Sequence, residues 1–237
     1  MSVFPQVIAD FEDRVKEVDL YFQLLLSLEN EEFAIVAGMG RQVVPVGKPP
    51  ADWASMLKGA AYLVLYNLVE AFVRRGFQAV FDAIRNDGIC GSDLIEVLRN
   101  QWIAQRNRKV KAFDGSPKVY IGIAGEIVRE VIAKQAASMS HDLMPIVGNI
   151  DADIVKKVFS DHGVEFKVPK AARGGVSLAT VKAKRNSLAH GVESFVEAGR
   201  NAVATTFVIE KTEVVLFMRS VLDNLEKYST AKSYKAR

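Results

Sequence analysis

Cysteine and histidine are scarce in this sequence. Its 237 residues contain one cysteine, Cys90, so an intramolecular disulfide and a cysteine-rich zinc site are both excluded. A chain with so little cysteine suits a reducing compartment, and we expect a cytoplasmic protein. With three histidines, few groups are available to bind a transition metal or to exchange protons near neutral pH.

Long apolar runs are also absent. The most apolar segment, 60–72, is interrupted by Asn67 and Glu70 and falls short of the roughly 20 residues that span a membrane. It predicts a buried core helix. The first residues lack the basic start, apolar run and small-residue cleavage site of a secretory signal, so we expect neither export nor a membrane partner.

Neither sign of charge dominates. The chain has 31 Lys and Arg residues against 28 Asp and Glu residues, and a net charge of +3 is too small to indicate a nucleic-acid partner by itself. Two segments are locally basic. Segment 99–113 contains no acidic residue, and segment 164–190 contains one, Glu165. Either segment could face a polyanion, although a solvated basic surface is the commoner explanation of such runs.

Helical periodicity is abundant, in a chain whose 49% hydrophobic content is that of an ordinary globular protein. Apolar residues recur at helical spacing from Phe4 to about Ala37 and again from Asp52 to about Arg85. Glycines and two adjacent prolines predict a loop between these helices, over 38–50. Shorter or later helices are expected over 94–103, 126–137, 154–159, 178–188 and 206–228. The sequence therefore predicts an all-α bundle of long antiparallel helices with irregular inserts.

Some segments carry no clear helical pattern. Loops are predicted over 106–118 and 169–175, and the start of 119–138 suits either a strand or a helix. We take the chain as one domain made of an N-terminal helix and loop, a core bundle, and a tail that should be frayed. These three parts are 1–52, 53–228 and 229–237.

Residues with catalytic chemistry gather in one segment, Lys184-Arg-Asn-Ser-Leu-Ala-His-Gly191. The sequence has no phosphate-loop signature, no dinucleotide glycine fingerprint, no zinc-protease helix motif and no nucleophile elbow. Arg185 offers a planar fork that can hold two phosphate oxygens, and the neutral imidazole of His190 can accept a proton near neutral pH. Because RNA carries its own nucleophile, the 2′-hydroxyl, such a set can cleave a phosphodiester with neither a metal nor a cofactor.

The spacing of Arg185, Asn186 and His190 along the chain limits which of these side chains can meet. Asn186 and His190 are four residues apart and share a helix face, whereas Arg185 and His190 lie roughly 140° apart around an ideal helix. They converge only where the helix ends or bends, and Gly191 makes an end at this point plausible. The alternative is a surface arginine and a capped or buried histidine at a helix end, since short coincidences of Arg and His are frequent.

The segment Arg-Asn-Ser-Leu-Ala-His-Gly resembles the R-x-x-x-x-H signature of the HEPN superfamily, including the polar residue after the arginine and the His-Gly ending. Three further stretches resemble a bacterial HEPN branch that is linked to defence and toxin systems. They are Leu65 to Glu70, Gly148 to Asp151 and the stretch through Ser194 and Phe195. The resemblance implies a helical bundle, commonly a homodimer whose two motifs face each other across a composite cleft, with metal-independent endoribonuclease activity.

The resemblance also implies a role for each residue of the motif. Arg185 would hold and polarise the scissile phosphate, and Asn186 would orient the phosphate or the imidazole. His190 would act as base or acid, or position the 2′-hydroxyl. The products would carry a 2′,3′-cyclic phosphate and a 5′-hydroxyl.

Glu70 lies in an apolar run, where an unpaired carboxylate would be expensive to bury. One explanation is a salt bridge to Arg74, four residues on. The other is that Glu70 points into the cleft beside the motif, as polar residues on an earlier helix do in HEPN nucleases, and on this ground we include it among the candidate catalytic residues. Tyr66 and Asn67 share the same two alternatives.

Several other residues are assigned structural positions. His141 and His162 lie in polar, loop-like surroundings and are expected at the surface. Cys90 lacks an activating base and should be inert. Trp53 and Trp102 could stack on bases, but core packing is the more usual role.

The leading hypothesis is a HEPN-type ribonuclease, the toxin or effector of a bacterial defence or toxin-antitoxin module, with RNA, a second copy and an antitoxin or defence-system protein as partners. The first alternative is a HEPN module that binds RNA or a nucleotide without cleaving it, and the second is an assembly protein. Candidate RNA contacts from the basic segments are Lys182, Lys184, Arg106, Arg108 and Lys109.

Overall fold

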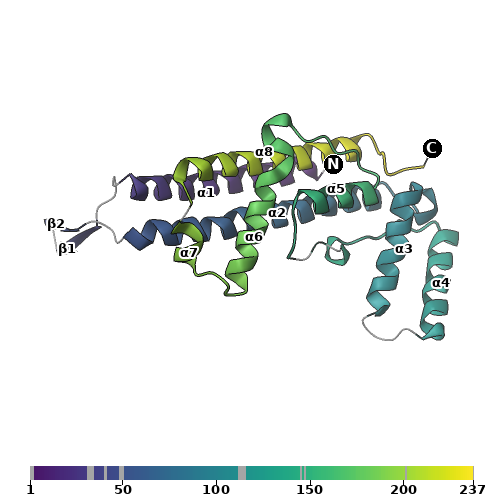
Figure 1. The fold of residues 1–237 in the computed structure, drawn as a ribbon. Helices are drawn as coiled ribbons and strands as arrows, with labels where there is room; N and C mark the ends of the chain where they lie inside the picture. Colours follow the sequence, from purple (N-terminus) through teal and green to yellow (C-terminus); the bar gives the residue numbers. More distant parts are fainter. Residues whose placement is uncertain are drawn as a thin grey trace.

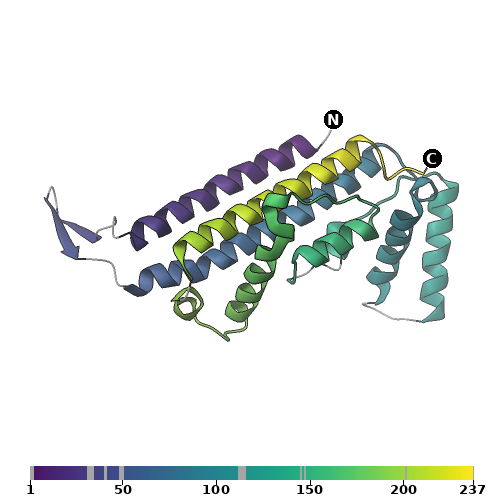
Figure 2. The ribbon, with the colours of Figure 1, turned by 45° about the horizontal axis from the view of Figure 1, so that its top comes forward.

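The computed structural model describes residues 3–30, 35–39, 42–47, 51–111, 116–144, 146, 148–200 and 202–236. Three long helices lie side by side along the molecule (Figures 1 and 2): α1 (Phe4–Glu29), α2 (Ala51–Asn86) and α8 (Ala204–Thr230). α1 runs in the opposite direction to α2 and α8. The predicted all-α bundle of long helices is confirmed.

α2 is the central helix of the bundle. Its 36 residues pack against α1, α8 and the two helices that follow each other before α8, α6 (Val176–Ala189) and α7 (Phe195–Arg200). By length and composition α2 is the one described helix that could cross a membrane, but 56% of its most apolar window is buried inside the protein. This burial matches the core helix predicted for 60–72, because a helix that is apolar on nearly every side needs neighbours around it.

Aromatic contacts and one ion pair join the three long helices. Phe22 of α1 stacks on Phe207 of α8 with 5.4 Å between ring centroids, and Phe11 meets the edge of Phe72 of α2 at 5.1 Å. On the exposed side, the guanidinium of Arg219 donates two hydrogen bonds to the carboxylate of Glu12, at 2.8 and 2.7 Å. Apolar packing provides most of the stabilisation here, since exposed ion pairs contribute at most about 1 kcal/mol.

α7 lies unusually close to α2. A Cβ on Gly199 would come within 1.9 Å of the Ser55 carbonyl oxygen, and a Cβ on Gly59 would come within 2.2 Å of the Phe195 carbonyl oxygen. At the start of α7, the hydroxyl of Ser194 accepts from the Glu197 backbone N–H while the Glu197 carboxylate accepts from the Ser194 N–H. This reciprocal capping fixes the start of α7, and the two glycines allow its backbone to touch that of α2.

Two helices project from the far end of the bundle, α3 (Glu96–Lys111) and α4 (Pro117–Ile132) (Figure 2). The loop predicted over 106–118 is wrong for 106–111, which continue α3, and for 117–118, which begin α4; residues 112–115 lie outside the described part of the chain. The ambiguous segment after Val119 is helical from its start. Proline at the first position of α4 favours this start, because its fixed φ suits a helix and its missing N–H is not needed there.

The first connection is also more ordered than predicted. α1 ends at Glu29 instead of near Ala37, and the strands β1 (Ile35–Met39) and β2 (Gln42–Gly47) form an antiparallel pair. Both strands contain β-branched residues, which favour extended backbone and compete with the helical pattern that suggested a longer α1. The remainder of the predicted loop, 40–41 and 48–50, lies outside the described residues.

The C-terminal tail is packed, which corrects the predicted frayed end. Tyr234 is 1% exposed, its hydroxyl donates to the Asp87 carboxylate at 2.5 Å, and its carbonyl accepts from the Ile95 N–H at 2.9 Å. One buried aromatic side chain with a paired hydroxyl is enough to hold a short polar segment against the bundle. Such an anchor has no periodic signal in the sequence.

Two histidines and one tryptophan are placed differently from the predictions. His162 is buried at 3% exposure, with Nδ1 at 2.7 Å from the Val158 carbonyl oxygen, and His141 is half-buried with Nδ1 donating to Gln78. Trp53 is 40% exposed, whereas Trp102 is buried as expected. Cys90 is buried, and its predicted inertness stays a prediction.

Candidate functional site

α6 carries the predicted motif and crosses the side of α2 (Figure 1). It begins after Gly175, whose φ of +87° suits glycine, and near its start the Ser177 hydroxyl hydrogen-bonds the buried Glu213 carboxylate. Ser177 is the second residue of α6. The first half of α6 buries Leu178 and Val181, and the second half, which carries the motif, is half-buried from Lys184 to Leu188.

The end of α6 is defined by a glycine-terminated cap. His190 is the C-cap residue, and Gly191 follows with φ +67°. The Gly191 N–H donates to the Leu188 carbonyl at 3.2 Å and the Val192 N–H to the Ser187 carbonyl at 2.9 Å, which is the Schellman arrangement. The predicted helix end is confirmed, and it leaves the His190 side chain exposed to solvent.

Arg185 is held by contacts from three directions. Its guanidinium lies over the ring of Tyr66, 4.7 Å from the centroid, and Nη1 donates to the Gly148 carbonyl at 3.3 Å and to Asn186 Oδ1 at 3.1 Å. A cation over an aromatic face is attracted by the ring's negative face. Arg185 is therefore half-buried with a fixed orientation.

Tyr66 is the support beneath this guanidinium. It is 1% exposed, and its hydroxyl accepts from the Ile150 N–H at 3.0 Å. Burial raises the pKa of Tyr66, the Ile150 N–H lowers it, and the negative charge of Glu70 raises it further, so that the net shift is upward. The phenol is therefore protonated at neutral pH.

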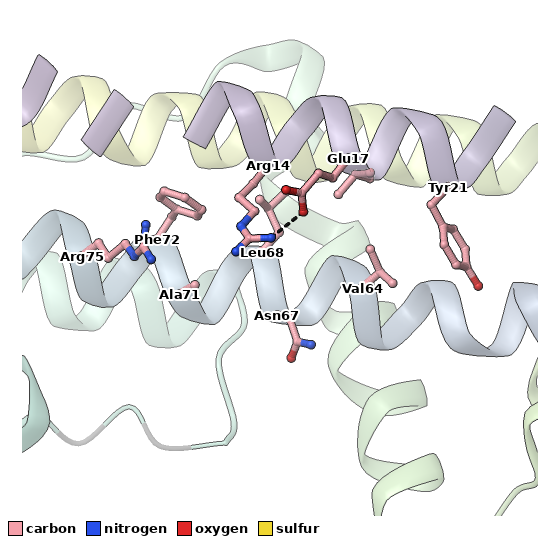
Figure 3. Close-up of a pocket in the computed structure, with 10 residues that line it drawn as sticks. Arg14, Glu17, Tyr21, Val64, Asn67, Leu68, Ala71, Phe72 and Arg75 are labelled. Carbon is pink, nitrogen blue, oxygen red and sulfur yellow. Dashed lines mark hydrogen bonds and ion pairs between the residues drawn. The ribbon is translucent and has the colours of Figure 1, made fainter. Parts of the chain in front are cut away.

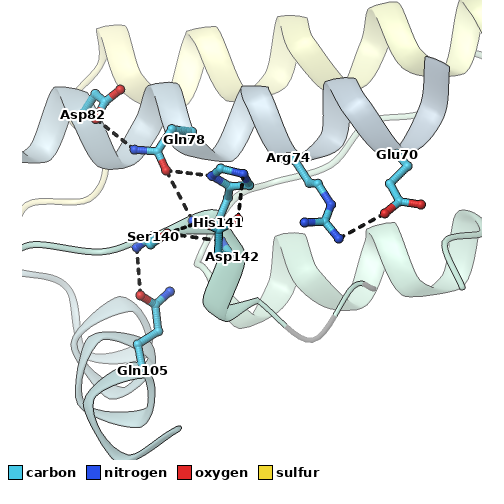
Figure 4. Close-up of polar contacts among 8 residues, drawn as sticks. All are labelled: Glu70, Arg74, Gln78, Asp82, Gln105, Ser140, His141 and Asp142. Carbon is cyan, nitrogen blue, oxygen red and sulfur yellow. Dashed lines mark hydrogen bonds and ion pairs between the residues drawn. The ribbon is translucent and has the colours of Figure 1, made fainter. Parts of the chain in front are cut away.

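Glu70 joins this support to a second arginine. Its carboxylate accepts from Arg74 Nη2 at 3.0 Å, as Figure 4 shows, so the salt bridge considered from the sequence is present. Through Tyr66, Glu70 also lies one contact away from Arg185. Among the described residues no hydrogen bond joins Glu70 to His190, and its catalytic role remains a prediction.

The polar contacts continue along α2 away from the motif (Figure 4). The Gln78 side-chain oxygen accepts from both the backbone N–H and Nδ1 of His141, at 3.3 and 2.9 Å, and its amide nitrogen donates to Asp82 at 2.9 Å. Asp142 faces the other ring nitrogen at 3.2 Å. Through these bonds, His141 holds the segment before Gly148 against α2.

Asn67 lies on a different side of α2 from Tyr66. It lines an open groove of about 480 Å³ between α1 and α2, with an apolar floor that includes Leu68 and Phe72 (Figure 3). Arg14 and Arg75 stand at the rim of this groove. Of the two residues that the sequence grouped with Glu70, Tyr66 belongs to the motif site and Asn67 does not.

The segment from Gly148 to Asp151 completes the site. Asn186 Nδ2 donates to Asn149 Oδ1 at 3.4 Å, and the Asp151 carboxylate caps α5 (Ala152–Asp161) by accepting from the Ile154 N–H at 2.9 Å. Asp151 also pairs with Lys182 of α6. Burial alone would raise the pKa of Asp151, but the Lys182 ammonium and the Ile154 N–H outweigh it and leave that pKa below its usual value. Sequence reasoning assigned no role to Asn149, because its contact with Asn186 depends on how α5 and α6 pack.

The residues predicted to contact RNA differ in whether they already have ion-pair partners within the protein. Lys184 pairs with Glu193 at 2.8 Å, and Lys182 pairs with Asp151. Arg106 pairs with Glu130 at 2.8 Å and lies over the ring of Trp102, on a helix at the other end of the molecule. The side chains of Arg108 and Lys109 lie outside the described part of the structure. An RNA phosphate would have to compete with these partners.

Among the described residues, no group of three or more His, Cys, Asp or Glu side chains has the arrangement of a metal site. The motif site consists instead of one guanidinium, two amides, a buried phenol and an exposed imidazole. These groups can bind an anion and exchange a proton, which are the two operations needed at a phosphodiester.

Comparison with known families shows the family of the chain. Residues 5–234 match the family model described as HEPN_MAE_28990-like HEPN, and the chain belongs to this HEPN family. No curated protein and no solved structure matches the chain. HEPN domains are often ribonucleases.

Proposed function

We propose that this protein is a metal-independent endoribonuclease and that it acts in the cytoplasm as the toxin or effector of a bacterial defence or toxin-antitoxin system. The observation that carries the proposal is that one helix of a HEPN-family chain presents both a guanidinium held in place, that of Arg185, and an exposed imidazole at its end, that of His190. A pre-oriented guanidinium stabilises charge that develops in a transition state without having to reorganise first.

The reaction uses the 2′-hydroxyl of RNA as nucleophile. The 2′-oxygen bonds to phosphorus as the bond from phosphorus to the 5′-oxygen breaks, which gives a 2′,3′-cyclic phosphate and a 5′-hydroxyl. A base accepts the proton of the 2′-hydroxyl, and an acid returns a proton to the 5′-oxygen. In this proposal His190 performs one of these transfers, Arg185 neutralises the phosphate oxygens, and Asn186 orients Arg185 through the bond at 3.1 Å.

A homodimer would bring together Arg185 of one copy and His190 of the other. Among the described residues no hydrogen bond links Arg185 to His190, and the residues after the motif expose apolar surface, with Val192 at 74% and Phe195 at 40%. A second copy covering this surface would bring its own His190 to the site. Apolar side chains exposed beside polar functional groups are typical of surfaces that bind a partner.

Mixing two inactive variants tests the dimer. Arg185→Ala and His190→Ala proteins are each inactive, but a mixed dimer has one site with both groups intact if the residues come from different copies. Recovery of up to about a quarter to a half of wild-type activity after mixing and re-association would support the composite site. No recovery, with mixed dimers demonstrated, would place the whole site in one chain.

A non-catalytic binding module is the second candidate. It is favoured by the hydrogen bonds of Arg185, whose Nη1 already donates to Gly148 and Asn186. An assembly protein would need neither residue. Expression in a bacterial host separates the three: a nuclease slows growth in a manner that requires Arg185 and His190, a binder retains RNA without product, and an assembly protein is indifferent to both substitutions. Asn86→Ala, an exposed amide at the end of α2, serves as the matched control.

A further inference from the structure

In the segment from Gly148 to Asp151, every residue except Asn149 is held against the bundle by hydrogen bonds, burial or an ion pair. The Gly148 carbonyl accepts from Arg185, and the Ile150 N–H donates to the buried hydroxyl of Tyr66 at 3.0 Å. The Ile150 side chain is 1% exposed, and Asp151 caps α5 and pairs with Lys182. The backbone on both sides of Asn149 is therefore fixed.

Asn149 is the exposed residue of this clamped segment. Its side-chain oxygen accepts from Asn186 Nδ2 at 3.4 Å, a long bond, and within the described part of the chain its own amide nitrogen has no protein partner. Asn186 in turn accepts from Arg185 at 3.1 Å. The carboxamide of Asn149 thus stands two hydrogen bonds from the guanidinium that would hold the scissile phosphate, on an exposed residue.

A carboxamide presents a donor beside an acceptor, the pattern that complements one edge of a nucleobase. Single-stranded RNA is usually recognised through such edges, because unpaired bases can turn outward from the strand. We infer that Asn149 reads the nucleobase next to the scissile phosphate and determines which RNA sequences enter the site. This inference rests on the proposed function, and it adds to it a residue that selects among RNA substrates.

The position of Asn149 suits selection better than chemistry. It lies outside the Arg-x-x-x-x-His segment, and its contact with the motif passes through Asn186. A side chain on a rigid backbone loses little entropy when it binds, so its discrimination is not reduced by reordering of the segment. The amide of Asn186 contacts the oxygen of this carboxamide and leaves its nitrogen available.

Two measurements on the full chain test the inference. In the first, wild type, Asn149→Ala and Asn86→Ala cleave a pool of single-stranded RNA of random sequence, and sequencing of the new ends gives the preference at each flanking position. In the second, His190→Ala and the His190→Ala/Asn149→Ala double variant bind four fluorescent 12-nucleotide RNAs made of A, C, G or U alone, with anisotropy as the readout. Thermal unfolding verifies that Asn149→Ala folds.

The expected result is a loss of preference. Asn149→Ala should reduce the discrimination between bases by roughly 5- to 150-fold at one flanking position, the range of a specific base contact, while Asn86→Ala retains the wild-type profile. An equal decrease at all sequences, or an unchanged profile, would overturn the inference and leave the nuclease proposal standing. If wild type cleaves nothing, the nuclease proposal fails, and the binding measurements still test the inference. Different affinities for the four RNAs in His190→Ala that become equal in the double variant would support base reading by Asn149. Equal affinity for all four RNAs in His190→Ala, or no binding, would refute it.

Discussion

The contact between α7 and α2 yields the sharpest stability prediction. Gly199→Ala places a methyl group 1.9 Å from the Ser55 carbonyl oxygen and 2.8 Å from the Gly59 nitrogen. Both neighbours are backbone atoms of α2, so neither can turn aside as a side chain would. α7 must move away from α2, and the turn after His190 moves with it.

The size of the effect follows from two opposing contributions. Alanine in place of glycine inside a helix gains about 0.5–1 kcal/mol, whereas overpacking costs about 1–3 kcal/mol and more where backbone blocks the space. We expect a net loss of about 2–3 kcal/mol, which in a chain of this length lowers Tm by roughly 4–12 °C. Gly125→Ala on α4 is the matched control: a Cβ there meets nothing within 4 Å, so Tm should rise by roughly 1–4 °C.

Thermal and urea unfolding of both variants provide the test. The midpoint should shift in opposite directions with the urea m-value unchanged, because both variants expose the same surface on unfolding. RNA cleavage should fall in Gly199→Ala and persist in Gly125→Ala. A Gly199→Ala protein as stable as wild type would refute the close approach of α7 and α2 and the reasoning built on it.

Three further variants examine the support of the site. Tyr66→Phe keeps the ring beneath Arg185 but leaves the Ile150 N–H without an acceptor, so unfolding should become easier by about 1–3 kcal/mol in urea titrations, and an unchanged stability would argue against that bond. Gly191→Ala forces an alanine to φ +67° and should lose about 1 kcal/mol, whereas Gly191→Asn should be tolerated; equal stability of the two would contradict the cap. Asp151→Asn retains the helix cap but loses the charge. Because the folded pKa of Asp151 is lowered, its stabilisation is present above roughly pH 4 and is lost as the pH falls through the folded pKa, so the Tm difference from wild type, clear at about pH 7, should shrink as the pH falls below about 4.

Local patterns account for the parts of the fold that were predicted correctly. α2 and α8 follow from apolar residues at helical spacing, and the end of α6 follows from Gly191 directly after His190. The sequence predicts only the first half of α3, because the basic second half has few apolar residues to mark a buried face. Its helix depends on pairs such as Arg106 with Glu130 of α4, which come from tertiary packing.

The motif could be located from the sequence, but its surroundings could not. Arg185, Asn186 and His190 are neighbours in the chain, so their proximity follows from one helix. Asn149 joins them across 37 positions, and Tyr66 reaches Ile150 across 84. Contacts of that length depend on how α2, α5 and α6 pack, and no periodicity within a single segment encodes them.

The most direct test is to incubate purified wild-type and His190→Ala protein with end-labelled RNA in excess EDTA and to determine the end groups of the products. The account predicts cleavage by wild type alone, with 2′,3′-cyclic phosphate and 5′-hydroxyl ends, and a rate for His190→Ala that is lower by about 100-fold or more. Absence of cleavage by wild type, or equal cleavage by both proteins, would contradict a nuclease site built on this motif.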